Sequence, residues 1–160
     1  MVGSTPYETT ILVRDSCLCL HVQRAARALA RRFDDAFRPL GLTNGQFSLL
    51  MSLNRPKPAG MASLAGLLAM DRTTLTAALK PLQRRRLVKV APDPADGRGR
   101  LLTLTQRGHT TLARALPVWK STHREVQRLL GDVGRLRSDL CALGSRPAAS
   151  HMLEHQTSSE

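Results

Sequence analysis

Apolar side chains recur at every third or fourth position over a long stretch near the start of the chain, from Asp15 to Leu40. This spacing places them on one face of a helix. Asp15 or Ser16 can cap the start of that helix, and Pro39 and Gly41 end it. The apolar stripe consists of Leu18, Val22, Ala25, Leu29, Phe33 and Phe37. The pattern therefore predicts one long amphipathic helix over residues 15–40.

Shorter helical patterns follow, each bounded by a capping or breaking residue. Thr43 caps the segment GQFSLLMSLN, which ends at the proline-containing loop RPKPAG. A second short helix is predicted for MASLAGLLAM, and Asp71 opens a third, RTTLTAALKPLQRRR. Pro81 lies inside this third helix, where proline removes a backbone hydrogen bond, so the helix is either kinked or locally tightened there.

The period then changes from helical to alternating. The runs LVKV (residues 87–90) and LLTLT (residues 101–105) predict two strands, and DPADGRGR (residues 93–100) between them predicts a hairpin tip. Gly97 and Gly99 would let this tip bend tightly. Asp96 lies two residues from Arg98 and is placed to pair with it, which would leave Arg100 exposed; the reverse assignment of the two arginines is equally open.

A last helical stretch starts near Gln106 and carries a heptad pattern of apolar and aromatic positions that ends around Val133. Gly131 and Gly134 interrupt it, and a further short helix follows. The fold class predicted from this order is mainly α with a small β-hairpin wing (α+β): a winged helix-turn-helix with long amphipathic helices at both ends. Those end helices have no other place to bury their apolar stripes.

Charge shows what the middle of the chain can bind. The 160 residues carry a formal net charge of +12 and a sequence pI near 11.3, which indicates an anionic partner: nucleic acid, a membrane surface or an acidic protein. Between Asp71 and Gly108 there are nine basic residues against three acidic ones. Concentration of the charge on the helix-plus-hairpin segment favours contact with the phosphates of a nucleic acid.

The start of the Asp71 helix is the candidate base-reading element. The second helix of a helix-turn-helix enters the DNA major groove with its N-terminal residues against the base edges. The candidate side chains on this helix offer hydroxyls, methyl groups and positive charges: Arg72, Thr73, Thr74, Thr76 and Lys80. On the wing the candidates are Asp96, Arg98 and Arg100, since a cationic side chain suits the negative potential of a minor groove. The plainer alternatives are a helix cap followed by solvated residues, and an ordinary polar hairpin.

The segments LGLTNGQFSLLMSL and MDRTTLTAALKPLQRRRLVKVAPDPADGRGRLLTLTQRG resemble the MarR family of bacterial transcription regulators, in pattern over about residues 15–143. The most specific parts are DRTTLT, RRRLV and the wing, where the family shows D-P-x-D-x-R followed by L-T-x-x-G. Two departures stand out: Gly97 where a second arginine is frequent, and Arg86 where a glycine often precedes the strand.

The resemblance implies a homodimer with interlocking end helices that presents two winged helices to a palindromic DNA operator. It also implies repression relieved by a small aromatic or phenolic effector, with no cofactor required. The expected organisation is an N-terminal extension and dimerisation helix (1–41), the DNA-binding domain (42–108), C-terminal dimerisation helices (109–146) and a disordered tail (147–160). The tail contains SHMLEH, which resembles an expression-vector remnant.

Cys17, Cys19 and Cys141 are candidate sensor residues. Some relatives detect organic peroxide through a cysteine in the first long helix, and a thiol near a helix N-terminus suits redox sensing. Soft-metal or metalloid binding is the rival hypothesis; whether any metal binds is unknown. Residues two apart on a helix point to nearly opposite sides, so Cys17 and Cys19 converge only if the helix starts later or frays. The plain alternative is that these are packing residues.

The remaining function classes are limited by what the sequence lacks. No catalytic motif is present, so an enzyme is not expected. No signal peptide or membrane-length apolar run is apparent, which predicts a protein of the bacterial cytoplasm, associated with the nucleoid when bound to DNA. The alternative from another class is a sequence-independent architectural DNA-binding protein, which would discriminate weakly between an operator and random duplex.

Overall fold

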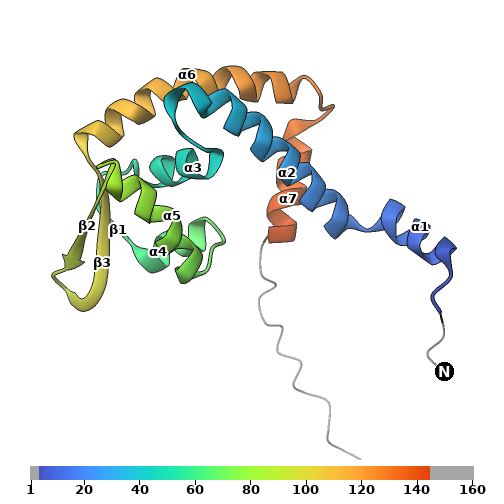
Figure 1. Ribbon diagram of the computed structural model, residues 1–160, viewed down its shortest axis with the longest axis horizontal. Coiled ribbons are helices and arrows are strands. Elements are labelled where there is room, and N and C mark those ends of the chain that lie inside the picture. The colour runs from blue at the N-terminus through green and yellow to red at the C-terminus, as the bar shows by residue number, and fades with distance from the viewer. Residues whose placement is uncertain (1–3, 145–160) are drawn as a thin grey trace, which may run out of the picture. The chain divides into compact units, whose positions relative to one another are not determined.

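The computed structural model describes residues 4–144, without the side chain of Arg98 (Figure 1). It is mainly helical with one small antiparallel sheet, which confirms the predicted fold class. The helices are α1 (Tyr7–Ser16), α2 (Leu18–Phe37), the 3-10 helix η1 (Arg38–Leu40), α3 (Asn44–Leu53), α4 (Met61–Leu67), α5 (Arg72–Arg84), α6 (Gln106–Gln127) and α7 (Val133–Gly144). The strands are β1 (Ala59–Gly60), β2 (Val88–Asp93) and β3 (Asp96–Leu104). The predicted tail at 147–160 lies outside the described residues.

The helix predicted over residues 15–40 begins later than expected, because the helical conformation is interrupted at Cys17. Cys17 ends α1, with its N–H bonded to the carbonyl of Val13, and also caps α2, with its Sγ accepting from the Leu20 N–H at 3.5 Å. Ser16 belongs to α1, where its hydroxyl donates to the Leu12 carbonyl at 2.6 Å. Neither Asp15 nor Ser16 is therefore the cap, and α1 is a helix that the sequence pattern did not predict.

The caps of α3 and α5 are those predicted. Thr43 accepts from the Gln46 N–H, and the Gln46 side chain accepts from the Thr43 N–H, which makes a complete capping box at the start of α3. Asp71 caps α5. Helix α5 continues through Pro81 to Arg84, so the proline does not end it.

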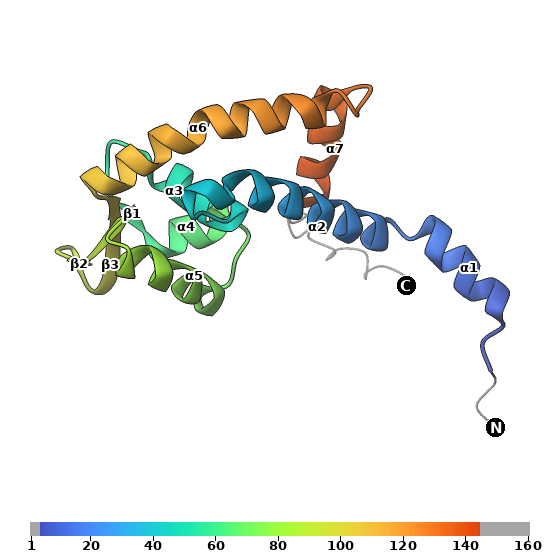
Figure 2. The same ribbon diagram turned by 45° about the horizontal axis from the view of Figure 1, so that its top comes forward.

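The sheet has the strand order β1-β3-β2, and both pairings are antiparallel. Val88 pairs with Leu104 at one end of β2, and Asp93 pairs with Asp96 at the other. Helices α3, α4 and α5 lie beside this sheet (Figures 1 and 2). Leu87, Val88 and Leu102 are buried where the strands meet these helices, so the hairpin is anchored at its base.

An aliphatic core fills the space between these elements, as the low aromatic content requires, and one row of rings joins three helices. Phe37 of α2 stacks on Phe47 of α3 with ring centroids 4.7 Å apart. Phe47 in turn lies 6.4 Å from Trp119 of α6, whose indole stacks on His123 at 4.7 Å. These contacts hold the end of α2 against α3 and α6.

The chain divides after His123 into two compact units. Helix α6 ends at Gln127, so the predicted heptad seam does not continue as one helix to Val133. The chain turns at residues 128–132, and Asp132 then starts α7, with its carboxylate accepting from the Arg135 N–H at 2.8 Å. Gly131 lies in the break as expected, whereas Gly134 lies inside α7.

Candidate nucleic-acid interface

Helix α5 has one buried and one exposed face. Its apolar residues Leu75, Leu79 and Leu82 are at most 3% exposed. The predicted DNA-contacting residues are all exposed: Arg72, Thr73, Thr74, Thr76 and Lys80. The helix therefore packs on the core through its leucines and presents the candidate side chains to the solvent. This is the arrangement that a recognition helix requires.

Hydrogen bonds within the first turns of α5 fix two of the threonine hydroxyls. The Asp71 carboxylate accepts from the Thr74 N–H at 2.8 Å and from the Thr74 hydroxyl at 2.6 Å. These two bonds, the hydroxyl first, lower the pKa of Asp71. The Thr76 hydroxyl donates to the Arg72 carbonyl at 2.7 Å. Both hydroxyl protons are therefore committed, so each of these threonines can offer DNA only oxygen lone pairs and its methyl group.

The wing differs from the predicted hairpin tip. Strand pairing extends into DPADGRGR on both sides, and the turn consists of Pro94 and Ala95 alone. The Asp93 carboxylate stabilises this turn by accepting from the Ala95 N–H at 2.9 Å. Pro92 pairs with Arg100 and Asp93 with Asp96, so the three residues 97–99 bulge out of β3 opposite that step.

The two wing glycines have different surroundings. A Cβ at Gly99 would lie 2.8 Å from the Cβ of Asp93 and 3.1 Å from the Asp96 carbonyl, so the bulge needs a glycine there. A Cβ at Gly97 would have no described atom within 4 Å. The prediction that both glycines allow a tight tip was wrong, because neither lies in the turn and only Gly99 is sterically required.

Of the predicted wing residues, Arg100 lies in the paired part of β3, facing the recognition helix. It lines a hollow of about 360 Å³ together with Arg72 of α5 and the carboxylates Asp93 and Asp96. The side chain of Arg98 lies outside the described residues, so its predicted pairing with Asp96 stays a prediction. Arg72 and Arg100 bring two positive charges from separate elements to one edge of the interface.

One arginine counted in the basic segment has a structural role. Arg85, the C-cap of α5, donates to the Gly41 carbonyl at 2.5 Å and to the Leu40 carbonyl at 3.4 Å. These carbonyls end η1, so the guanidinium ties the end of the recognition helix to the chain that follows α2. The partners are distant in sequence, and no local pattern could have shown this contact.

The L-T-x-x-G segment after the wing also has a physical explanation. Thr105 caps α6 by accepting from the Gly108 N–H at 3.0 Å, and its own N–H donates to the Leu87 carbonyl at 3.0 Å. A Cβ at Gly108 would lie 2.2 Å from that same carbonyl oxygen. The close approach of α6 to the start of β2 therefore requires glycine at position 108.

The three cysteines differ in exposure: Cys17 is half-buried, and Cys19 and Cys141 are exposed. The Cys19 sulfur accepts from the Gln23 side chain at 3.1 Å. Cys17 lies outside α2, at its cap, and this is the condition under which the two neighbouring thiols can converge. Within residues 4–144, no three His, Cys, Asp or Glu side chains are grouped as a metal site would need.

A model of the MarR family matches residues 42–99, which cover α3 to the wing. The chain is 40% identical to a transcriptional regulator of M. tuberculosis, MosR, solved in complex with DNA; the match covers 81% of this chain and 94% of that one, with a TM-score of 0.75. The chain belongs to the MarR family. It is thus a DNA-binding transcriptional regulator with a winged-helix fold.

Two curated relatives show how far this membership extends. The chain is 34% identical over 76 residues to the HTH-type transcriptional repressor NicR of Pseudomonas putida, covering 48% of each protein. It is 34% identical over 119 residues to the transcriptional activatory protein BadR of Rhodopseudomonas palustris, covering 72% of this chain and 66% of that protein. The chain thus spans about half of the first relative's length. These relatives are regulators rather than enzymes.

None of the helices within residues 4–144 is long and apolar enough to cross a membrane.

Proposed function

We propose that this MarR-family chain is a homodimeric repressor that recognises a palindromic operator and releases it when a small effector binds. The observation that carries the proposal is the two-faced helix α5, with its leucines buried and its cationic and threonine side chains exposed beside Arg100. In this proposal α5 enters the major groove, and the wing residues Asp96, Arg98 and Arg100 approach the neighbouring minor groove and its phosphates.

Unpartnered apolar side chains support the dimer. On α2, Leu18 is 70% exposed and Leu29 is 43% exposed. On α7, Leu140 and Leu143 are 45% and 64% exposed. Apolar surface of this kind on helices at both ends of the chain is typical of an interface. We therefore assign residues 1–41 and 109–146 to dimerisation and residues 42–108 to DNA binding. Sedimentation at several protein concentrations tests this assignment: a monomer at every concentration would contradict it.

The test of operator recognition uses Thr76, because two substitutions separate its chemical groups. Thr76→Val keeps the shape but removes the oxygen, whereas Thr76→Ser keeps the oxygen and removes the methyl group. Selection of bound sequences from a random duplex pool should yield a palindrome for the wild type. A base contact of this type contributes about 1–3 kcal/mol, so one of the two variants should relax the preference at one position per half-site.

A matched control separates recognition of the bases from nonspecific electrostatic binding to the phosphates. Arg100→Ala should weaken binding to all duplexes alike and reduce the salt dependence, because a phosphate contact carries no sequence information. Equal affinity of the wild type for the selected and random duplexes would instead indicate the architectural, sequence-independent class.

The position of Cys17 favours a second candidate, a thiol-based sensor. In this alternative a peroxide oxidises one thiol to a sulfenic acid and is reduced, with water or an alcohol leaving. The second thiol then attacks that sulfur, forming a disulfide and releasing water. Operator binding by the Cys17→Ser/Cys19→Ser variant and by Cys141→Ser, each with and without hydrogen peroxide, tests it. Release of the wild type and of Cys141→Ser, but not of the double variant, is the expected result for a sensor; equal responses of all three would exclude it.

A further inference from the structure

A second concave site lies at the C-terminal end of the recognition helix, away from its DNA-reading start. It is a pocket of about 300 Å³ between η1, the C-cap of α5 and the first turns of α6. The lining residues, hereafter the arginine pocket, are Leu40, Arg85, Arg107, Thr110, Thr111 and Arg114. Helix α5 has 13 residues, which separates Arg85 from Arg72 by about 20 Å.

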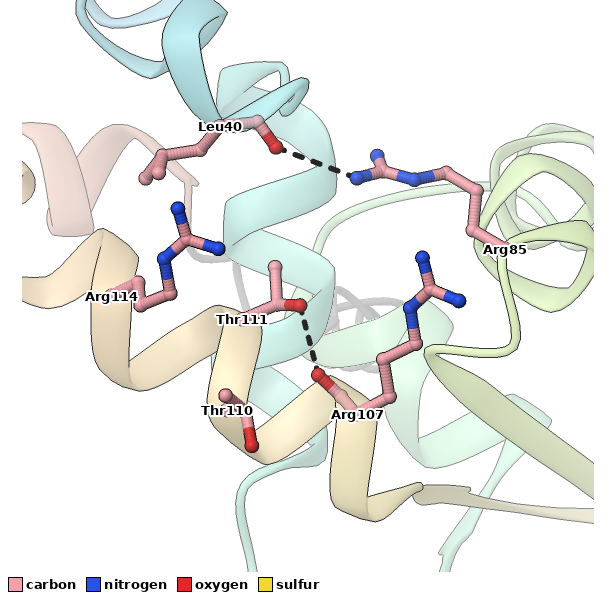
Figure 3. A pocket seen from close by; sticks show the side chains of 6 residues that line it. All are labelled: Leu40, Arg85, Arg107, Thr110, Thr111 and Arg114. Atoms are coloured by element: carbon pink, nitrogen blue, oxygen red, sulfur yellow. Dashed lines mark hydrogen bonds between the residues drawn. The ribbon is translucent and has the colours of Figure 1, made fainter.

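The side chains of the arginine pocket come together because of helical spacing and one long-range contact. Arg107, Thr111 and Arg114 lie on one face of α6, and Arg85 reaches the same space from α5. Figure 3 shows the guanidinium groups of the three arginines around a shared space with Thr111 between them. The Thr111 hydroxyl donates to the Arg107 carbonyl at 2.8 Å.

The charge of the pocket is not neutralised by the described residues. None of the lining side chains is acidic. Within residues 4–144, the guanidinium groups of Arg107 and Arg114 form no ion pair. Like charges held close together repel one another, and a bound anion would relieve that repulsion. The pocket therefore favours a negatively charged ligand.

The size of the arginine pocket and its hydrogen-bond donors limit the class of anion that it can bind. Guanidinium groups offer paired N–H donors that match the oxygens of a carboxylate or a phosphate. Leu40 is the only apolar lining residue, so the pocket suits a charged group rather than a hydrocarbon ring. Its volume lies at the lower end of the range for small-molecule sites. Both a phosphate and a carboxylate satisfy these conditions, and both are compact oxyanions.

Arg85 connects this site to DNA binding. Its guanidinium holds the C-cap of the recognition helix to the carbonyls of Gly41 and Leu40. An oxyanion in the pocket is a stronger acceptor for the same N–H groups than a neutral carbonyl. Binding would therefore draw Arg85 away from Gly41 and loosen the attachment of α5.

We propose that the arginine pocket binds the phosphate or carboxylate group of a small molecule, and that the bound oxyanion competes for Arg85 and so lowers affinity for DNA. This inference rests on the proposed function, since it assigns a chemical class to the effector. By thermodynamic linkage, duplex DNA must weaken oxyanion binding by the same factor as the oxyanion weakens DNA binding.

The experiment measures binding of inorganic phosphate and of acetate to the full chain by calorimetry, with ionic strength held constant by chloride. The variant Arg107→Gln/Arg114→Gln should bind the responsive anion about tenfold more weakly or worse, because it loses two charge-assisted contacts. The matched control is Arg124→Gln/Arg128→Gln, which removes the same charge near the other end of α6 and should bind as the wild type does. Heat of binding with phosphate alone or with acetate alone shows whether the pocket prefers a phosphate or a carboxylate.

Operator affinity of each protein is then measured with and without that anion. Weaker operator binding by the wild type, with the double variant unaffected, is the expected result. The proposal is overturned if neither anion binds, if the double variant binds the anion normally, or if bound anion leaves operator affinity unchanged. A lower salt dependence of duplex binding in the double variant, without anion binding, would place these arginines on the DNA backbone instead. Operator binding in anion-free buffer reports on the proposed function separately.

Discussion

Ala69 and Arg86 hold a backbone conformation that side chains other than glycine rarely adopt, with φ of 51° and 56°. Each follows a helix and completes the same terminating motif. The Arg86 N–H donates to the Gln83 carbonyl at 2.8 Å, and the Leu87 N–H donates to the Leu82 carbonyl at 2.9 Å, after α5. After α4, the equivalent hydrogen bonds are donated by the Ala69 N–H to the Gly66 carbonyl and by the Met70 N–H to the Ala65 carbonyl. We predict that glycine at either position stabilises the protein.

The magnitude follows from two opposing terms. A left-handed conformation costs a residue with a Cβ about 1–2 kcal/mol. Glycine loses more conformational freedom on folding than other residues, and this entropy loss offsets about 0.5–1 kcal/mol of the strain that the substitution relieves. Ala69 and Arg86 are both exposed, so little packing is lost. The net prediction for Ala69→Gly and for Arg86→Gly is a gain of about 0.5–1 kcal/mol each, or roughly 1–4 °C in melting temperature for a chain of this size.

Denaturant unfolding followed by circular dichroism, at one fixed protein concentration, measures the effect. Arg86→Ala is the control for the lost charge and should be nearly neutral, because it keeps the Cβ and therefore the strain. Gly41 gives the inverse test: its φ is 63°, and an added Cβ would make only an ordinary contact 3.5 Å from Arg85, so Gly41→Ala should cost about 1 kcal/mol. A loss of stability in both Ala69→Gly and Arg86→Gly would refute the reasoning.

The other predictions concern fixed contacts around the wing and the recognition helix. Gly108→Ala should destabilise the fold by about 2–3 kcal/mol, because its Cβ would lie 2.2 Å from the Leu87 carbonyl oxygen. Gly97→Ala, whose Cβ would meet no described atom within 4 Å, is the matched control in the same melting experiment. Asp71→Ala should cost about 1 kcal/mol at neutral pH through loss of the α5 cap, and Asp71→Asn less. The pKa of Asp71 is lowered in the folded state by its bonds from Thr74, so this stabilisation is present above the unfolded pKa and is lost as pH falls through the folded one. Titration of stability with acid should therefore show a smaller loss in Asp71→Ala than in the wild type; equal losses would contradict the assignment.

Local signals in the sequence were sufficient to predict much of the fold. Hydrophobic spacing predicted the hairpin and the helices other than α1, and capping preferences placed Thr43 and Asp71 at the starts of α3 and α5. The exposed set on α5 was also predictable, because helical geometry alone decides which side chains oppose the buried leucines. Capping and periodicity act within a few residues, so a single sequence contains the information they need.

Two local features were predicted wrongly. The break at Cys17 was missed because the apolar spacing continues across it and Ser16 resembles a better cap. The turn at Pro94 and Ala95 was missed because strand pairing extended into a segment rich in turn-forming residues.

What the sequence by itself determined is the winged-helix class, the basic segment and the exposed face of α5, since each follows from composition and local periodicity. Only the tertiary structure decided the roles of Arg85 and Gly108. In the sequence, Arg85 is one of nine similar basic residues. In the structure, its guanidinium donates hydrogen bonds to the carbonyls of Leu40 and Gly41. Gly108 is required by the approach of the Leu87 carbonyl, which lies just before β2. Such contacts arise from the packing of whole elements, and no spacing along the chain records which atoms that packing brings together.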